Sequence, residues 1–436
     1  MLFGTDGIRA KMGQAPLDAE TIQRIGQLLL HTYGPGGKIV VGSDTRGSCQ
    51  QLKHWLFDGF PFENILDLGV VPTPVVAFET RARGAQLGIM LTASHNPPEY
   101  NGLKFFGPQG YKLPAETAQA WSDMVENDRV PHVQNGQPEL HAATPEHYEK
   151  FLLSQFAQDQ FKGQTLAWDL ANGAGSTWVP NWVRPLMGLQ PIVGDQPNGH
   201  NINLGFGALD VAHLSRLVRE KGLAGGMALD GDGDRLVVVD AQGMAIHGDR
   251  VLYGLYRAML EEGHLVKDVV GTILTGLGLE SVFRLEGVSL HRTPVGDQYV
   301  LSHMLEHGLL LGGEPSGHLI QGDLFYAGDG FLAGLRLTRA MARNPHFWAE
   351  VNERIPLLPT FEKNVEVRVK PPLSTLRLVS AAAHQLERTM GEQGRLILRY
   401  SGTEPKLRVV VESGQLSRFQ GEIEALLQAI QSELGE

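Results

Sequence analysis

The sequence predicts an α/β protein made of three similar α/β domains with mixed, largely parallel sheets, followed by a smaller C-terminal α+β domain. Strand-like and helix-like segments alternate through roughly the first 350 residues, as they do where helices cover the faces of a sheet. The strand-like and helix-like segments after about residue 350 no longer alternate in this way. The length of 436 residues also exceeds what one hydrophobic core holds, so several domains are expected.

The first helix and the strands are predicted from apolar spacing and from turn residues. Segment 17–34 carries apolar residues at helical intervals, Asp18 is a suitable N-cap, and Gly34-Pro35 ends the pattern. Short apolar runs bounded by glycine or polar residues indicate buried strands. The strands are expected at 38–42, 87–91, the start of 165–176, both ends of 226–240 and 268–275, with a further helix over 279–287.

The C-terminal part has the pattern of a small α+β domain. Strands are expected at 365–370, 394–400 and 407–413, and helices at 375–390 and 416–434. Polar, proline-containing or otherwise irregular stretches separate this part from the rest and divide the rest into three. The expected domains are 1–145, 146–243, 244–355 and 356–436.

Composition excludes several functional classes. Lys and Arg number 37 against 48 Asp and Glu, and the net charge of -11 argues against a nucleic-acid or membrane partner. A local group of basic residues can still bind a small anionic substrate. Cys49 is the single cysteine, which excludes an internal disulfide and fits a reducing compartment. No run reaches the roughly 18 apolar residues of a membrane span and residues 1–10 lack a signal-peptide core, so we expect a soluble cytoplasmic protein.

The sequence "DGDGDR" predicts a metal site. Asp230, Asp232 and Asp234 alternate with Gly231 and Gly233, between two apolar segments that resemble buried strands. Glycine permits a tight turn, so the three carboxylates can converge. Converging carboxylate oxygens are the ligands that Mg²⁺ prefers.

A solvated acidic turn and a calcium loop also place carboxylates close together in the sequence. The solvated turn fits an isolated pair of aspartates better than three aspartates interleaved with glycines. The calcium loop needs Gly at its sixth position and Glu at its twelfth. Counted from Asp230, those positions hold Arg235 and Ala241, so the calcium loop is excluded.

The sequence "LTASHNPPEYNGLKFF" (91–106) places Ser94 directly after a buried strand, on a loop stiffened by Pro97-Pro98. Ser94 and His95 are neighbours, and on an extended segment they would point to opposite faces, which disfavours a hydrolase dyad. Ser94 could instead carry a phosphoryl group next to the metal, with Lys104 at the far end of the loop contacting phosphate or transferring a proton. The alternative is a rigid turn with an ordinary serine.

Further polar turns are candidate substrate contacts. In "GEPSGH", Glu314, Ser316 and His318 are side chains that recognise sugar hydroxyls or an amine, unless the segment is simply a polar hairpin. In "FGTDGIR", Arg9 is a candidate phosphate contact. The segment "RYSGTEPKLR" combines hydroxyls, backbone N–H groups and two arginines, as in an anion-binding nest. Its candidate residues are Arg399, Ser401, Gly402, Thr403 and Arg408.

The segments "TASHNP", "DGDGDR", "GEPSGH" and "SGTEP", in this order along the whole chain, resemble the α-D-phosphohexomutase superfamily. The resemblance implies four domains around a central cleft and a phosphoryl transfer through a phosphoserine at Ser94. It also implies one Mg²⁺ per chain, held by Ser94, Asp230, Asp232 and Asp234. Glu314 and Ser316 would bind the sugar, and the 399–408 loop its non-reacting phosphate. Catalytic or phosphate-contacting roles would fall to Arg9, Lys104 and His318.

Within the superfamily, "FGTDGIR", "NGHNIN" and "SGTEPKLRVVVE" are most similar to bacterial phosphoglucosamine mutases. This implies conversion of glucosamine 6-phosphate to glucosamine 1-phosphate through a 1,6-bisphosphate, with glucosamine or glucose 1,6-bisphosphate as activator. A sugar phosphate would be the ligand, and a homodimer is compatible with the family. "HNPPEYNG" is equally similar to phosphoglucomutase/phosphomannomutase relatives, and Pro315 stands where glucosamine mutases tend to carry a polar residue. Both departures keep the phosphoglucomutase/phosphomannomutase activity open. A non-catalytic sugar-phosphate-binding relative and a Mg²⁺ phosphatase are also compatible with these segments.

Overall fold

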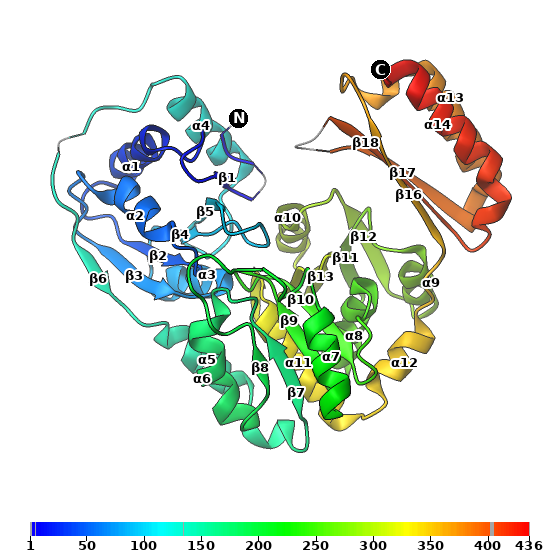
Figure 1. Ribbon diagram of the computed structural model, residues 1–436, viewed down its shortest axis with the longest axis horizontal. Coiled ribbons are helices and arrows are strands. Elements are labelled where there is room, and N and C mark those ends of the chain that lie inside the picture. Colours follow the sequence, from blue (N-terminus) through cyan, green and yellow to red (C-terminus); the bar gives the residue numbers. More distant parts are fainter. Residues whose placement is uncertain (1, 5, 134, 402–404, 436) are drawn as a thin grey trace. The chain divides into compact units, whose positions relative to one another are not determined.

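The computed structural model describes residues 2–4, 6–133, 135–401 and 405–435 (Figure 1). The chain forms two compact units. The first comprises residues 1–272 and 291–352, and the second comprises residues 273–290 and 353–436. The first unit contains two mixed sheets and most of a third, and the second contains one small antiparallel sheet.

The first sheet positions the serine loop. Its strand order is β1-β5-β4-β2-β3-β6, with β4, β2, β3 and β6 parallel and β5 antiparallel to both β1 and β4. Because β2 and β4 are parallel neighbours, the loops after their carboxyl ends lie at one edge. The strands are β1 (Ile8–Lys11), β2 (Ile39–Ser43), β3 (Ile65–Val70), β4 (Leu87–Leu91), β5 (Tyr100–Phe106) and β6 (Leu140–Ala142). The helices are α1 (Ala19–Tyr33), α2 (Cys49–Phe57), α3 (Thr73–Ala82) and α4 (Ala115–Glu126).

The second sheet positions the acidic loop. Its order is β10-β9-β7-β8, in which β7 is parallel to β8 and β9, and β10 returns antiparallel to β9. The turn between β9 and β10 contains the "DGDGDR" sequence. The strands are β7 (Leu166–Asp169), β8 (Ile192–Val193), β9 (Gly225–Leu229) and β10 (Leu236–Asp240). The helices are α5 (Glu146–Gln155), α6 (Gly175–Met187) and α7 (Ala212–Lys221).

The third sheet carries the "GEPSGH" segment as a β-hairpin. Its order is β12-β11-β13-β14-β15, with β11 and β13 parallel and β13, β14 and β15 antiparallel. The strands are β11 (Asp268–Thr272), β12 (Ser289–Thr293), β13 (Leu311–Gly313), β14 (Leu319–Gln321) and β15 (Phe325–Gly328). The helices are α8 (Gly248–Glu261), α10 (Asp297–His307), α11 (Gly330–Arg343) and α12 (Phe347–Arg354).

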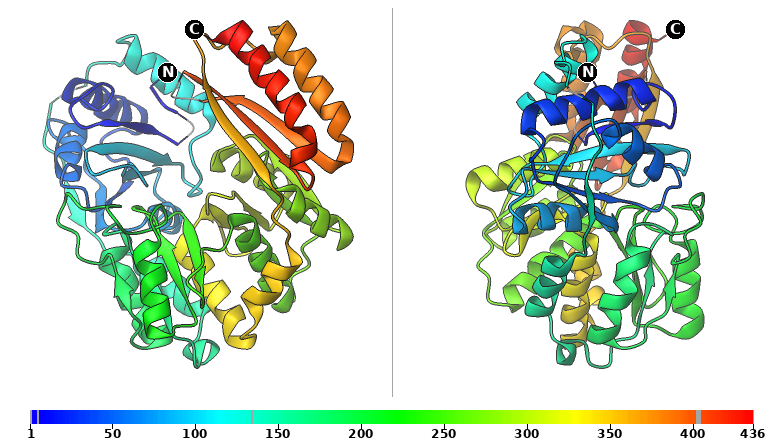
Figure 2. Two further views of the ribbon diagram at one scale, coloured as in Figure 1. Left: turned by 45° about the vertical axis from the view of Figure 1, so that its right-hand side comes forward. Right: turned by 90° about the vertical axis from the view of Figure 1, so that its left-hand side faces the viewer.

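The second unit contains a three-stranded antiparallel sheet in the order β16-β18-β17. Two long helices lie along one face of this sheet (Figure 2, orange and red), and the apolar faces of both build a separate core. Helix α9 also belongs to this unit, where the backbone N–H of Leu277 donates to Glu412 at 3.0 Å. The elements are α9 (Leu277–Leu285), β16 (Thr360–Glu366), β17 (Gly394–Tyr400), β18 (Lys406–Ser413), α13 (Arg377–Met390) and α14 (Gln420–Leu434).

The structure confirms the predicted fold class, with alternating α/β elements followed by a smaller α+β part. The Asp18 cap is confirmed, because its carboxylate accepts a hydrogen bond from the Thr21 N–H at 2.9 Å. The strand expected at 365–370 begins earlier, at Thr360, and ends at Glu366. The division into four domains at the expected boundaries stays a prediction. Among the described residues, no helix combines the length and apolar character needed to span a membrane.

Candidate active site

Ser94 lies in the loop after β4, with its hydroxyl directed at the acidic loop. The Ser94 Oγ donates to Oδ2 of Asp230 at 2.7 Å and lies 3.3 Å from Nδ1 of His95. The expectation that Ser94 and His95 point to opposite faces is therefore wrong. The reason is local: Ser94 has φ of 51°, so the backbone turns here instead of running extended. The conformation brings adjacent side chains together and presents the hydroxyl to the carboxylates.

Arg46 holds the serine loop in place. Its guanidinium is fully buried and donates to the carbonyl oxygens of Ser94 at 3.0 Å, Asn96 at 2.8 Å and Tyr100 at 2.9 Å. Asp44 accepts from the Arg46 Nε at 2.9 Å. Arg46 follows β2, so its position results from the parallel pairing of β2 with β4. A buried guanidinium satisfied by several carbonyls fixes the path of an otherwise irregular loop.

The three aspartates converge as predicted. One carboxylate oxygen from each of Asp230, Asp232 and Asp234 lies within 4.8 Å of the other two, and all three residues are buried. The turn requires glycine, because Gly233 has φ of 74°. Burial, followed by the neighbouring Asp234 and Asp232 carboxylates, raises the pKa of Asp230 well above its ordinary value. Three buried carboxylates this close favour a bound cation.

The unpaired oxygen atoms agree with a magnesium site. Oδ1 of Asp232 and Oδ1 of Asp234 are buried and accept no hydrogen bond from any residue that the structure describes. Buried carboxylate oxygens normally have partners, so these two are suited to bind a metal ion. The donor set is all oxygen, which is typical for Mg²⁺. These residues therefore fit the ion that the sequence predicts.

Lys104 reaches the same carboxylates from β5. Its Nζ lies 2.8 Å from Oδ2 of Asp232 and 2.6 Å from Oδ2 of Asp234. Lys104 lies within β5, opposite Met90 of β4, so it is on a strand and not at the end of the serine loop as we expected. The side chain of Thr73, at the start of α3, donates to Oδ2 of Asp232 at 2.5 Å. The strand and the helix thus fix the orientation of the acidic loop.

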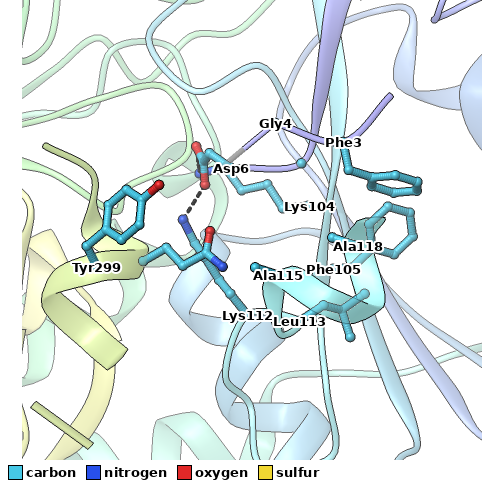
Figure 3. A pocket seen from close by; sticks show the side chains of 12 residues that line it. Phe3, Gly4, Asp6, Lys104, Phe105, Lys112, Leu113, Ala115, Ala118 and Tyr299 are labelled. Carbon is cyan, nitrogen blue, oxygen red and sulfur yellow. Dashed lines mark hydrogen bonds and ion pairs between the residues drawn. The ribbon is translucent and has the colours of Figure 1, made fainter. Parts of the chain in front are cut away.

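The N-terminal segment adds charged groups beside Lys104 (Figure 3). Asp6 forms ion pairs with Arg9 and Lys112, and lies 3.5 Å from Nζ of Lys104. Burial opposes ionisation of Asp6, but Lys104, Lys112 and Arg9 outweigh it and lower its pKa to about 2. Asp6, Lys104 and Lys112 line a pocket of about 150 Å³, whose lining also includes Phe3.

The "GEPSGH" hairpin faces this cluster through His318. Nε2 of His318 lies 3.1 Å from Oδ2 of Asp297, and its Nδ1 lies 3.7 Å from Oδ1 of Asp234. Burial disfavours the charged imidazole, but Asp297 and Asp234 outweigh it and raise the pKa of His318 to about 10. Glu314 accepts a hydrogen bond from the Gly296 N–H at 3.0 Å, and Ser316 is exposed. The segment forms a β-hairpin between β13 and β14. Of its three candidate side chains, Glu314 and His318 have specific polar partners.

The remaining candidates lie in the second unit. Arg399 on β17 and Arg408 on β18 are directly paired across the sheet. Ser401 is buried, and its N–H donates to the Lys406 carbonyl at 2.8 Å. Gly402 and Thr403 lie outside the described residues. That this loop completes the site around Ser94 stays a prediction.

The first unit thus brings together the candidates from its three sheets, and it adds groups that the sequence analysis missed: Asp6, Arg46, Lys112 and Asp297. Asp6 and Asp297 lie in "FGTDGIR" and "TPVGDQYV", two glycine-containing segments in which a carboxylate could have been singled out. For Arg46 the available signal was its place after a predicted strand. Lys112 has no distinctive sequence context.

Comparisons with known proteins agree with this geometry. Residues 1–130 match phosphoglucomutase/phosphomannomutase alpha/beta/alpha domain I, residues 247–356 match domain III, and residues 362–427 match the C-terminal domain. Phosphoglucosamine mutase of Hyphomonas neptunium is 37% identical over 421 residues, which are 94% of each chain.

Solved structures show the same fold. A phosphoglucomutase/phosphomannomutase family protein from Burkholderia thailandensis has a TM-score of 0.78 at 22% identity, covering 100% of this chain and 99% of that one. N-acetylphosphoglucosamine mutase of Aspergillus fumigatus, in complex with GlcNAc-6P and magnesium, has a TM-score of 0.68 at 18% identity, covering 99% and 96%. From the matching domains and the full-length identity, the chain belongs to the phosphohexomutase family of isomerases, in its phosphoglucosamine mutase branch.

Proposed function

We propose that this protein interconverts glucosamine 6-phosphate and glucosamine 1-phosphate through a phosphorylated Ser94. The observation that carries the proposal is the 2.7 Å contact between the Ser94 hydroxyl and Asp230, inside a group of three buried aspartates. A serine at this position can hold a phosphoryl group only where positive charge offsets the carboxylates. Lys104, Arg9 and a bound cation would supply that charge.

The transfer has two balanced half-reactions. In the first, the free hydroxyl oxygen of the sugar phosphate forms a bond to phosphorus while the bond from phosphorus to Ser94 Oγ breaks. Oγ keeps the electron pair, and the sugar hydroxyl loses its proton to a basic group. The resulting 1,6-bisphosphate reorients, and its other phosphoryl group returns to Ser94. Glucosamine or glucose 1,6-bisphosphate would therefore act as activator by phosphorylating Ser94 in unphosphorylated enzyme.

The chain's own residues position these groups. Asp230, Asp232, Asp234 and the phosphorylated Ser94 would hold Mg²⁺, which when bound neutralises charge on the transferred phosphoryl group. Arg46 fixes the loop that presents Ser94. Because the transfer is mainly a matter of position and charge, small displacements of this loop reduce the rate strongly.

Substrate recognition is assigned to the hairpin and to the C-terminal loop. Glu314 and Ser316 would bind the sugar, with Arg9 and His318 contacting phosphate or transferring protons. The second phosphate would bind at Arg399, Ser401 and Arg408, together with Gly402 and Thr403. We further propose a cytoplasmic location, in agreement with a single, buried Cys49, and a homodimer as the assembly.

The decisive experiment measures turnover of glucosamine 6-phosphate, glucose 6-phosphate and mannose 6-phosphate with Mg²⁺ and a trace of 1,6-bisphosphate. We expect a strong preference for the amino sugar, and loss of turnover in Ser94→Ala with unchanged circular dichroism. Equal turnover of the neutral sugars would overturn the amino-sugar assignment. Near-normal activity of Ser94→Ala would overturn the phosphoserine, and sustained release of inorganic phosphate as the main product would indicate a phosphatase.

A further inference from the structure

A cluster of histidines lies on the first unit, away from the aspartates. His303 and His307 are four residues apart on α10, and their rings stack with centroids 4.2 Å apart. The ring of His291, from β12, lies 5.1 Å from that of His303. Three imidazoles from two elements therefore share one small region. The proposed sugar-phosphate reaction uses none of them.

The positions of the nitrogen and oxygen atoms are suited to a metal ion. One ligand atom from each of His303, Glu306 and His307 lies within 4.8 Å of the other two. A tetrahedral zinc ion with bonds of roughly 2.0–2.1 Å places its ligand atoms roughly 3.3 Å apart. Side-chain rotation can bring the three ligand atoms from their present separation to this distance. Histidines at positions i and i+4 on one helix face are a spacing that binds zinc in proteins.

The unpaired nitrogen of His303 is a second, independent observation. Nε2 of His303 is buried and has no hydrogen-bond partner among the residues that the structure describes. A buried ring nitrogen without a partner is costly unless another group, such as a metal ion, binds it.

The imidazoles of His307 and His291 already have partners that leave one nitrogen each for an ion. Nδ1 of His307 lies 3.0 Å from the carbonyl oxygen of His303, which leaves Nε2. Nε2 of His291 lies 2.8 Å from Oδ1 of Asp268, which leaves Nδ1. A carboxylate on the far nitrogen of a ligating histidine is the usual way in which proteins orient such a ligand. The cluster also lies at the C-terminal end of α10, where the helix dipole favours a cation.

From these contacts we propose that His291, His303 and His307, with Glu306, form a binding site for a borderline transition-metal ion such as Zn²⁺. Imidazole ligands favour Zn²⁺, Ni²⁺ and Cu²⁺ over Mg²⁺, so this site and the aspartates select different ions. Asp297, which contacts His318, begins the same helix, and the cluster lies roughly 9–15 Å further along it. The metal site is therefore separate from the candidate active site.

The test measures Zn²⁺ affinity of the chelator-treated full chain by competition with a chromophoric chelator, in millimolar Mg²⁺ to occupy the aspartates. We expect one equivalent of Zn²⁺ bound by the unmodified protein. His307→Ala and His303→Asn should each weaken binding at least about tenfold. His384→Ala, an exposed histidine on α13, is the matched control and should change nothing. His307 is exposed, so its truncation is not expected to disturb folding.

Co²⁺ provides a spectroscopic readout of the ligands. We expect visible absorption bands of a nitrogen-coordinated Co²⁺ in the unmodified protein and in Asp232→Asn, and their loss in His307→Ala. Sugar-phosphate turnover in His307→Ala should equal that of the unmodified protein, which reports an intact fold. Equal Zn²⁺ affinity in His307→Ala, His303→Asn and the unmodified protein would overturn the site. So would a Co²⁺ spectrum that disappears in Asp232→Asn.

Discussion

The guanidinium of Arg46 donates a hydrogen bond to the carbonyl oxygen of Ser94 at 3.0 Å, from a side chain that is fully buried. The two residues come from loops that follow different strands, and they lie 48 positions apart in the chain. The position of the candidate nucleophile therefore depends on the pairing of β2 with β4, and not only on the sequence of its own loop.

Replacing Arg46 with lysine should impair catalysis more than binding. Lysine keeps the charge, but a single nitrogen cannot reach the carbonyls of Ser94, Asn96 and Tyr100 together. We expect kcat to fall roughly 10²-fold with a smaller change in KM, because a displacement of about 1 Å has this effect. Steady-state kinetics test this against Arg81→Lys, an exposed control on α3. Wild-type kcat in Arg46→Lys would contradict the positioning role.

Gly231→Ala should separate the serine loop from the acidic loop. A Cβ at this glycine would lie 2.6 Å from the carbonyl oxygen of Ser94 and 2.8 Å from Nδ2 of Asn203, so one loop must move. We expect kcat to fall roughly 10²-fold. Gly421→Ala on α14 is the control, since its Cβ would meet no atom within 4 Å and a helical alanine stabilises by up to about 1 kcal/mol. Equal activity of the two variants would refute the close approach.

Asp232→Asn should weaken Mg²⁺ binding and lower activity together. Removing one charge from the three carboxylates reduces the attraction for a divalent cation, and we expect affinity to fall roughly tenfold or more. Calorimetric titration of Mg²⁺ into chelator-treated protein measures this independently of turnover. Asp210→Asn, at an exposed position in the same part of the chain, serves as the control. An unchanged Mg²⁺ affinity would remove Asp232 from the metal site.

Asp169 should make stability depend on pH. Burial outweighs the hydrogen bonds from the Gly207 and Ala171 N–H groups and raises its pKa to about 6. A raised carboxyl pKa means that Asp169 stabilises the fold while protonated, below pH 4. This contribution, up to about 3 kcal/mol, is lost as the pH rises from about 4 to 6.

The variant Asp169→Asn isolates this effect, because the amide oxygen can still accept from the Ala171 N–H at 2.9 Å and carries no charge. Relative to the unmodified protein, its free energy of unfolding should increase between pH 4 and pH 7. Denaturant unfolding followed by tryptophan fluorescence measures the difference, since Trp168 lies next to Asp169 on β7. A difference that does not vary with pH would show that Asp169 titrates normally.

The convergence of the three aspartates was predictable because these residues are close in sequence. Asp230, Asp232 and Asp234 occupy one turn, and the glycines between them permit the conformation that brings the carboxylates together. The place of Ser94 after a buried strand was also predictable, since the apolar run 87–91 is continuous. The direction of the Ser94 side chain, toward His95, was not predictable. The left-handed backbone conformation of Ser94 depends on buried partners from other segments, such as Arg46.

The sequence by itself determined the order of α/β elements, the acidic turn and the family resemblance, because these depend on local spacing and on residue type. Only the tertiary structure decided which distant charges meet. Lys104 reaches Asp232 across 128 positions, and Asp297 joins His318 to Lys112 where α10 begins. Such contacts depend on how sheets and helices pack, and that packing is not encoded at any one position. The physical reason is that a buried charge requires an opposite charge nearby, whichever part of the chain supplies it.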